Sequence, residues 1–501
     1  MGFPFTTLDP LPDSTVSWFV QPSLGLAVTF NDNIRYRARD RESDVIVSVT
    51  PGILVAANSP RVTGIMTYTP RLSFYLSNSE ENRLTHAGNA QFTANLVQDR
   101  LFVDARASAY TENLFGGFID NTVDGARRNE VQTITASVSP YLVQRFGSLA
   151  NARAGYIFAV TDQTRGDPSR PVLVEDPIFG PRLERRNFAA NSFLSHTGYA
   201  TVRTGEDFGR VLLQGNVFGT TYEGDGIYEN AYRWAAFVES GYAITRAIAV
   251  VGDLGYEKLE FNTVPKTDIS GLLWAIGVRV RPSETSDATV KYGRRDGYEA
   301  FQGEASTNLF GPRTRLFVNY SDRLTNTALQ AAELLQTTTL DPFGNPVFAA
   351  NGAPVSPGFS TGQLGVQNGL FRTRRASVSI RHALTRDVFV LNVSYENRRP
   401  FAADPRAAQQ VPTEGASVGL SWSRPLDELT NFTSYVRYGV RSTGERASSD
   451  ANIYAFGAVL TRTLSPTLSG SISYRFDARD EEALDDLIYR NVVVAAIRKT
   501  F

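Results

Sequence analysis

The carboxyl-terminal stretch LIYRNVVVAAIRKTF, from Leu487 to Phe501, alternates between apolar and polar positions. One parity carries Leu487, Tyr489, Val493, Ala495, Ile497 and Phe501, and the other carries Arg490 and Arg498. Successive side chains of a strand point to opposite faces, so this stretch predicts a terminal β-strand with one apolar and one wetter face.

The composition favours strands over helices throughout the chain. Its 501 residues include 31 Phe, 21 Tyr and 40 Gly but no Cys and only 2 Met, which suits strands and turns. Mean hydropathy is -0.20 and no apolar run reaches about 18 residues, so no transmembrane helix is predicted. The formal net charge of -1 gives no reason to expect a nucleic-acid partner.

Alternating segments of about ten residues recur along the chain and predict about 22 strands, the rhythm of a membrane β-barrel. The fold class is therefore all-β: a single antiparallel up-and-down transmembrane barrel over residues 16–501, preceded by a periplasmic arm over residues 1–15. The predicted strands include Arg61–Leu76, Asn187–Arg203 and Glu304–Phe310.

The connections alternate strictly between short and long. Short ones include Asn58–Pro60 and Gln98–Arg100, and long ones include Thr111–Asn129 and Arg323–Arg372. Bacterial barrels have short periplasmic turns and long extracellular loops, so this alternation predicts the orientation and places Phe501 on the periplasmic side.

Parity within the strands predicts a lipid-facing set and a lumen-facing set. Trp18, Trp234 and Trp422 fall on the outward parity near strand ends, where an aromatic girdle would lie. The predicted pore-lining charges are Arg106, Arg153, Arg279, Arg281, Lys291, Arg295, Arg315, Arg381, Arg437, Arg441, Arg475, Arg490 and Arg498, with Asp104, Glu239, Asp253, Glu257, Glu396 and Asp477. Basic residues predominate, which favours anionic or hydroxylated solutes, while a paired Arg–carboxylate ladder that only braces the wall is the alternative.

The longest predicted loop, Leu324 to Leu370, begins with the helix formers TALQAAELLQ. It is either a constriction folded into the pore or an extracellular cap.

Enzymatic motifs are lacking. Of the three histidines, none opens an H-E-x-x-H motif, and no G-x-S-x-G or phosphate-binding loop occurs. His196, next to Ser195, is the one candidate for a hydrolase pair, formed with a Ser on a neighbouring wall strand. We expect no enzyme, no cofactor, no metal and no catalytic residue.

The terminal Phe501 resembles the end of bacterial outer-membrane barrels, although these usually carry an aromatic residue where Lys499 stands. The first hairpin, VQPSLGLAVTFNDN (Val20–Asn33) followed by ESDVIVSVTPGI (Glu42–Ile53), resembles a family of porin-like outer-membrane barrels associated with exopolysaccharide, capsule and exosortase-type loci of Gram-negative bacteria. That resemblance implies a surface barrel that exports a polysaccharide.

We therefore predict an outer-membrane channel for hydrophilic solutes, with exopolysaccharide export as the leading activity. The alternatives are a general or uptake porin for small anionic solutes or oligosaccharides, and a loop-plugged surface scaffold or adhesion protein. Met1–Pro4 lack the basic and apolar regions of a signal peptide, so we expect the given chain to follow a removed leader. Expected partners are outer-membrane lipid and lipopolysaccharide, the barrel-assembly machinery through the strand ending at Phe501, and periplasmic polysaccharide-export components.

Overall fold

The computed structural model describes residues 18–113, 130–165, 172–176, 180–184, 191–340, 346–348, 364–406, 410–444, 450–481 and 486–501. The predicted arm over residues 1–15 lies outside them. Among the described residues, no helix has the length and apolar character needed to cross a bilayer.

The described chain is almost entirely strand. The first fourteen strands are β1 (Trp18–Asn31), β2 (Asp44–Asn58), β3 (Val62–Tyr68), β4 (Arg71–Tyr75), β5 (Arg83–Thr85), β6 (Gly88–Val97), β7 (Leu101–Asn113), β8 (Glu130–Phe146), β9 (Ala150–Arg165), β10 (Val172–Asp176), β11 (Gly180–Glu184), β12 (Asn191–Thr204), β13 (Val211–Gly224) and β14 (Tyr232–Ala243). The other fourteen are β15 (Ile248–Phe261), β16 (Thr267–Ser283), β17 (Ser286–Arg295), β18 (Tyr298–Asn308), β19 (Thr314–Thr325), β20 (Thr338–Leu340), β21 (Pro346–Phe348), β22 (Leu370–Ala383), β23 (Val388–Ala402), β24 (Thr413–Pro425), β25 (Thr430–Thr443), β26 (Ala451–Ser465), β27 (Leu468–Glu481) and β28 (Asp486–Thr500). The described helices are α1 (Thr327–Thr337) and the 3₁₀ turns η1 (Ser79–Glu81), η3 (Glu206–Phe208) and η4 (Gly226–Tyr228).

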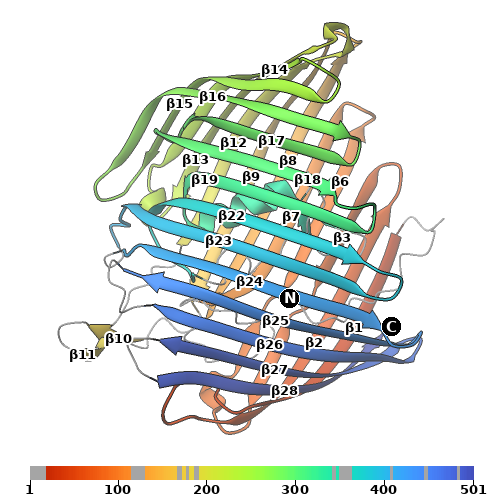
Figure 1. The fold of residues 1–501 in the computed structure, drawn as a ribbon, viewed down its shortest axis with the longest axis vertical. Coiled ribbons are helices and arrows are strands. Elements are labelled where there is room, and N and C mark those ends of the chain that lie inside the picture. Colours follow the sequence, from red (N-terminus) through yellow and green to blue (C-terminus); the bar gives the residue numbers. More distant parts are fainter. Residues whose placement is uncertain are drawn as a thin grey trace.

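All of these strands except the separate pairs β10–β11 and β20–β21 form one closed antiparallel barrel, as predicted (Figure 1). Its sheet contains 24 strands, but β3 with β4 and β5 with β6 each occupy one position, which leaves a wall of 22. The wall closes where β28 pairs with β1, from Ser23 opposite Thr500 to Asn31 opposite Val492. Closure satisfies the backbone groups of both edges, which an apolar environment requires.

Asp32 reinforces this seam between the two ends of the chain. Its Oδ1 accepts a hydrogen bond from the Asn491 backbone amide at 2.7 Å, and its Oδ2 accepts one from Asn491 Nδ2 at 2.8 Å. The side chain of Arg41 pairs with the same carboxylate. One carboxylate therefore ties the loop after β1 to the last strand.

The Asp32→Ala variant is expected to lose about 1–3 kcal/mol of folding free energy, because the seam loses charge-assisted hydrogen bonds. The temperature at which the folded band disappears on a semi-native gel should fall. The control is Asp268→Ala, which removes an exposed carboxylate from β16, across the barrel from the seam. It should leave that temperature unchanged. An equal temperature for both variants would contradict the role of Asp32.

The two faces of the wall differ as the alternation predicts. The outward parity of β16 exposes Leu272 and Ile276 by 54% and 61%, whereas Leu273 between them is 4% exposed. Trp18 and Trp234 are also exposed and lie on the outward parity. Trp422 lies near the end of β24, where its Nε1 donates to Asp387 Oδ1 at 2.7 Å. Their role as a membrane girdle stays a prediction.

The two ends of the barrel also differ. The end that carries Phe501 has short connections and is called the short-turn end; the other is the long-loop end. The strict alternation is wrong, most clearly where β17 and β18 join at the long-loop end through Asp296 and Gly297 alone. Both residues have positive φ, 55° and 84°, the signature of a tight hairpin turn. β18 consequently begins at Tyr298 and not at the predicted Glu304.

Other strand boundaries also differ from expectation. The predicted strand Arg61–Leu76 is interrupted between β3 and β4, at Thr69 and Pro70, because proline cannot donate a ladder hydrogen bond. β12 begins at Asn191, and the predicted start at Asn187 lies outside the described residues.

Candidate functional site: a helix inside the barrel

α1 is formed by the helix-favouring run TALQAAELLQT and begins at a defined cap. Asn326 adopts an extended conformation, and its Oδ1 accepts the Leu329 amide at 2.8 Å. The Asn326 Nδ2 group donates to the Tyr228 hydroxyl, also at 2.8 Å. The start of α1 is therefore fixed to η4, which lies almost one hundred residues earlier in the chain.

A hydrophobic cluster surrounds this start. It consists of Phe193, Ile227, Tyr228, Ala231, Leu259, Phe261, Leu324, Ala328, Leu329 and Leu370. Phe193 stacks on Tyr228 with 4.2 Å between ring centroids. The cluster joins β12, η4, β15, β19 and β22, so it fills the long-loop end of the barrel between these strands with a dry core.

A buried ion pair holds the chain just before α1. Asp296, 1% exposed, accepts from Arg233 Nη2 at 2.7 Å and from the Leu324 backbone amide at 3.2 Å. Burial by itself would raise the pKa of the Asp296 carboxyl, but Arg233, Arg295 and Arg323 together hold that pKa below its ordinary value. Asp296 is therefore an anion that positions both the wall and the segment entering α1.

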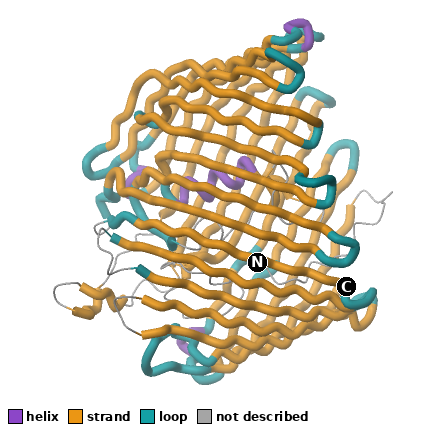
Figure 2. Tube along the Cα trace, in the orientation of Figure 1, coloured by secondary structure: helices purple, strands orange, loops and turns teal. Residues whose placement is uncertain are grey.

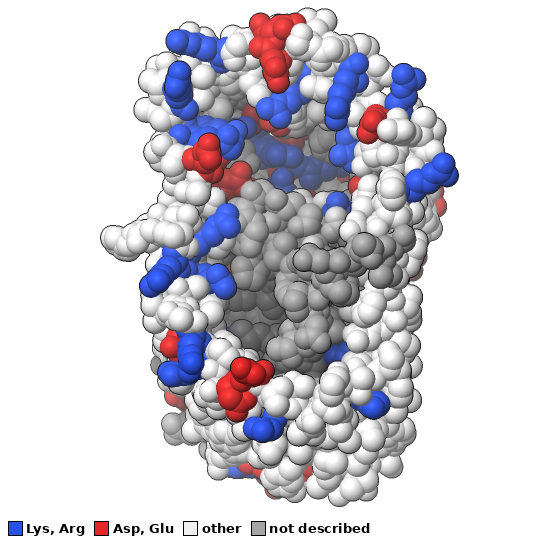
Figure 3. Space-filling model, turned by 90° about the vertical axis from the view of Figure 1, so that its right-hand side faces the viewer, with Lys and Arg blue, Asp and Glu red and all other residues white. Residues whose placement is uncertain are grey.

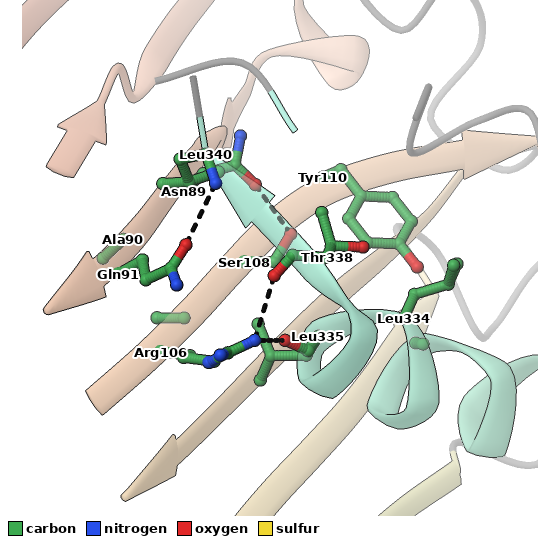
Figure 4. A pocket seen from close by; sticks show the side chains of 12 residues that line it. Asn89, Ala90, Gln91, Arg106, Ser108, Tyr110, Leu334, Leu335, Thr338 and Leu340 are labelled. Atoms are coloured by element: carbon green, nitrogen blue, oxygen red, sulfur yellow. Dashed lines mark hydrogen bonds between the residues drawn. The ribbon is translucent and has the colours of Figure 1, made fainter. Parts of the chain in front are cut away.

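Arg106 of β7 holds the other end of α1 (Figure 4). Its Nη1 donates to the carbonyls of Leu335, Gln336 and Thr338 at 3.1, 2.9 and 2.9 Å. The last carbonyls of a helix lack intrahelical partners and carry the negative end of the helix dipole, so a guanidinium is a favourable partner there. The sequence predicts Arg106 as a pore-lining cation, whereas the structure shows it bound to the chain's own helix.

α1 bridges opposite walls of the barrel. On one side Gln330 accepts from Arg375 of β22 at 3.0 Å, and Glu333 pairs with Arg323 of β19 at 3.1 Å. On the other side Gln336 donates to Ser137 of β8 at 2.9 Å. Figure 2 accordingly shows the helix in the middle of the barrel. The first part of the longest loop therefore folds inward.

The two ends of the lumen have different accessibility. At the long-loop end, Glu112, Gln163 and Arg398 are 2%, 0% and 2% exposed, although all three are polar residues on the inner face. The short-turn end is hollow, with Lys and Arg more frequent than acidic residues around and inside the opening (Figure 3). Among the described residues, the wall therefore surrounds a hollow at the short-turn end and closely packed side chains at the long-loop end.

A small, partly open pocket lies between α1 and the wall formed by β6 and β7. Its polar lining includes Asn89, Gln91, Ser108 and Tyr110, and its apolar lining includes Leu334, Leu335 and Leu340 (Figure 4). Gln91 accepts the Leu340 amide at 3.0 Å, which ties the chain after α1 to β6. The pocket therefore exists because α1 is held at both ends.

Many predicted lumen charges form ion pairs on the inner face. Lys291 pairs with Asp253 at 2.7 Å, and Arg279 and Arg281 share Asp287. Glu396 binds Arg375 and Arg398, Asp477 binds Arg475 and Arg490, and Arg153 lies 3.9 Å from Asp104. In this part of the wall, the inner face therefore carries the paired Arg–carboxylate groups that the alternative prediction expected to brace it.

The remaining predicted charges have other neighbours. Arg498 donates to Ser23 Oγ at 2.9 Å, and Glu239 accepts from Asn216 at 3.4 Å. Glu257 is 2% exposed beside the long-loop cluster, Arg295 faces Tyr298, and Arg441 faces Gly415 and Ala451. No carboxylate among the described residues pairs with Arg315, Arg381 or Arg437.

Arg375, Arg398 and Asp287 also form ion pairs on the inner face, but they are not among the predicted lumen charges. Arg375 and Asp287 share the parity of predicted lumen residues, so the alternation contained the signal for both. Arg398 lies one residue past the predicted end of its strand, and only the full length of β23 places it on the inner face.

Among the described residues, no hydrogen bond joins His196 to a serine of a neighbouring strand, so the candidate hydrolase pair does not form. The hydroxyl of Tyr156 bonds to His196 Nδ1, and the Phe158 ring packs against His196 at 5.3 Å between centroids. Adjacent residues of a strand face opposite sides, and Ser195 is buried on the inner face. Within the described part of the chain, no three His, Cys, Asp or Glu side chains gather as a metal site.

Comparison with solved structures yields outer-membrane receptors. The ferric-catecholate import receptor Fiu of E. coli K12, in its open form, superposes with a TM-score of 0.53 at 9% identity, covering 96% of this chain and 82% of the receptor. The FrpB iron transporter of Neisseria meningitidis (F5-1 variant, apoprotein) gives 0.51 at 11% identity, covering 97% and 82%. No protein-family model and no curated protein sequence matches the chain.

At these identities the likeness is one of fold. The chain has a closed 22-strand antiparallel barrel, the fold of these solved receptor structures.

Proposed function

We propose that the protein is an outer-membrane channel for hydrophilic solutes that is gated by α1, with export of an exopolysaccharide as its leading activity. The observation that carries this proposal is a helix bound to both walls inside a barrel with a polar inner face. A helix that only capped the barrel would not need contacts to opposite walls below the rim.

The difference between the hollow short-turn end and the packed long-loop end supports a direction of transport. We infer that solute enters from the short-turn end, which is periplasmic in barrels of this type, because the described wall surrounds a hollow there, and that it meets α1 before it reaches the surface. Amide, hydroxyl and guanidinium donors on the inner face suit a hydroxylated chain, and the pocket beside α1 offers both amides and apolar side chains. Both features support an exported sugar polymer.

A closed surface scaffold is the second candidate, because the described residues at the long-loop end leave polar side chains such as Gln163 and Arg398 almost fully buried. The two candidates differ in whether α1 moves. If α1 is a gate, it must move away from its contacts with the wall. In a scaffold, α1 stays bound to the wall.

Cross-linking α1 to the wall is expected to abolish ion conduction in planar bilayers. The chain has no cysteine, so Gln336→Cys with Ser137→Cys introduces two unique thiols at a contact of α1 with β8. A short bis-methanethiosulfonate reagent should lower the open probability to near zero, and a reductant should restore it. Gln336→Cys alone, treated identically, is the control.

The outcomes of this experiment separate the candidates. Conduction that persists in the cross-linked protein would rule out α1 as the gate. A protein that never conducts, even after α1 is released, would be a scaffold. Loss of surface polysaccharide on gene deletion then supports export, and loss of solute uptake would instead indicate an uptake porin.

A further inference from the structure

Two arginines face each other on the inner wall near the short-turn end. Arg315 of β19 and Arg381 of β22 are direct cross-strand partners, and both side chains are exposed. Side chains in such positions start about 5 Å apart, and like charges placed there destabilise a sheet. Elsewhere on the inner face the basic side chains Lys291, Arg279 and Arg475 each have a carboxylate partner.

The surroundings of this pair contain no compensating acid among the described residues. Its same-face neighbours are Asn308, Phe317, Ser379 and Val390. Asp287 lies two strands away and already binds two arginines. Glu304 faces Asn319, four residues along β19 from Arg315, which is about 14 Å.

A third arginine extends the pair. Arg437 of β25 lies three strands from Arg381, about 15 Å between backbone positions. Its side chain crosses Gly419 of β24: a Cβ at Gly419 would lie 3.0 Å from Arg437 Cγ. Because Gly419 leaves this space, the aliphatic stem of Arg437 leans over β24, while its guanidinium stays near the ring of Tyr435 on its own strand.

Two aromatic rings support the guanidinium groups. Arg315 lies over Phe317 at 5.0 Å from the ring centroid, and Arg437 lies over Tyr435 at 5.3 Å. These cation–π contacts orient the groups without neutralising them, so their charge remains available to a ligand.

We propose that Arg315, Arg381 and Arg437 form a binding site for acidic oligosaccharides, whose carboxylates bridge the guanidinium groups. A carboxylate between Arg315 and Arg381 removes their mutual repulsion and accepts paired hydrogen bonds from a planar fork. A second carboxylate farther along the sugar chain reaches Arg437. The site deepens the proposed function and rests on the entry of solute at the short-turn end, where Arg315 and Arg381 are exposed.

Isothermal titration of the purified barrel with a short galacturonate oligosaccharide tests the site without requiring conduction. Wild type should bind, and Arg315→Gln with Arg381→Gln should weaken binding at least tenfold. The corresponding Lys variants, which keep the charge but lose the planar fork, should fall between. Arg437→Gln should weaken binding less, by roughly threefold, because one carboxylate keeps its two partners.

The matched control is Arg424→Gln with Arg462→Gln, which removes the same charge from the outward parity near the same end. Its binding should equal that of wild type. Equal binding by the Arg315/Arg381 variant, equal binding of a neutral oligosaccharide of the same length, or equally tight binding of inorganic phosphate would each overturn the inference. A barrel that binds galacturonate through these residues but never conducts would refute only the channel.

Discussion

Replacing Arg106 by alanine should raise the open probability of the channel by about 30-fold. Arg106 Nη1 shares its hydrogens among the Leu335, Gln336 and Thr338 carbonyls, and these are charge-assisted bonds to the unsatisfied end of α1. Hydrogen bonds that involve a charged group contribute about 1.5–3 kcal/mol, and about 2 kcal/mol corresponds to roughly 30-fold in an equilibrium. The start of α1 remains bound at Asn326, so the helix is expected to swing and not to unfold.

Single-channel recording measures this directly, because closed and open intervals are counted separately. Arg106→Lys should give an intermediate value, since an ammonium group restores a donor without the guanidinium geometry. Arg153→Ala is the matched control: it removes a cation from the adjacent inner wall, where Arg153 contacts Asp104 and Tyr141 and not α1. If Arg153→Ala opened the channel equally, general loss of positive charge would explain the effect.

The Asp296→Asn variant should destabilise the barrel by about 3 kcal/mol, because it removes the carboxylate that pairs directly with the Arg233 guanidinium. Asparagine tolerates the positive φ of this turn as aspartate does, so the variant isolates the charge. Equilibrium unfolding in urea in the presence of lipid vesicles measures the change. Asp268→Asn, at an exposed position, is the control and should have no effect.

The same pair predicts an acid dependence. The pKa of Asp296 is lower in the folded protein than in the unfolded chain, so its stabilisation is complete above about pH 4 and is lost as the pH falls through the folded value. Wild type should therefore lose stability more steeply than Asp296→Asn below about pH 4. Parallel curves for the two proteins would show that Asp296 does not carry this contribution.

The strand count and the two faces of the wall could be read from the sequence because they depend on local alternation. For β15 the alternation predicted both ends correctly, because the observed strand is also Ile248–Phe261. The turn at Asp296–Gly297 was also readable, since Asp-Gly between alternating segments is a strong hairpin signal, but the expectation of long loops at that end hid it.

The helical character of Thr327–Thr337 was visible in its composition, but its place was not. Its partners Arg106 and Ser137 lie about two hundred residues earlier in the chain, and no local pattern encodes such a contact. The same holds for the ion pairs. Parity placed Lys291 and Asp253 on one face, but only the register of the strands between them decided that they meet.

The sequence by itself determined a closed wall with an apolar exterior and a polar interior, because alternate residues of a strand must face opposite solvents. Only the tertiary structure decided that α1 crosses the interior and that Arg315, Arg381 and Arg437 share one arc of the wall. The reason is that strand register and loop packing depend on contacts between distant residues, whose free energy no short stretch of sequence contains.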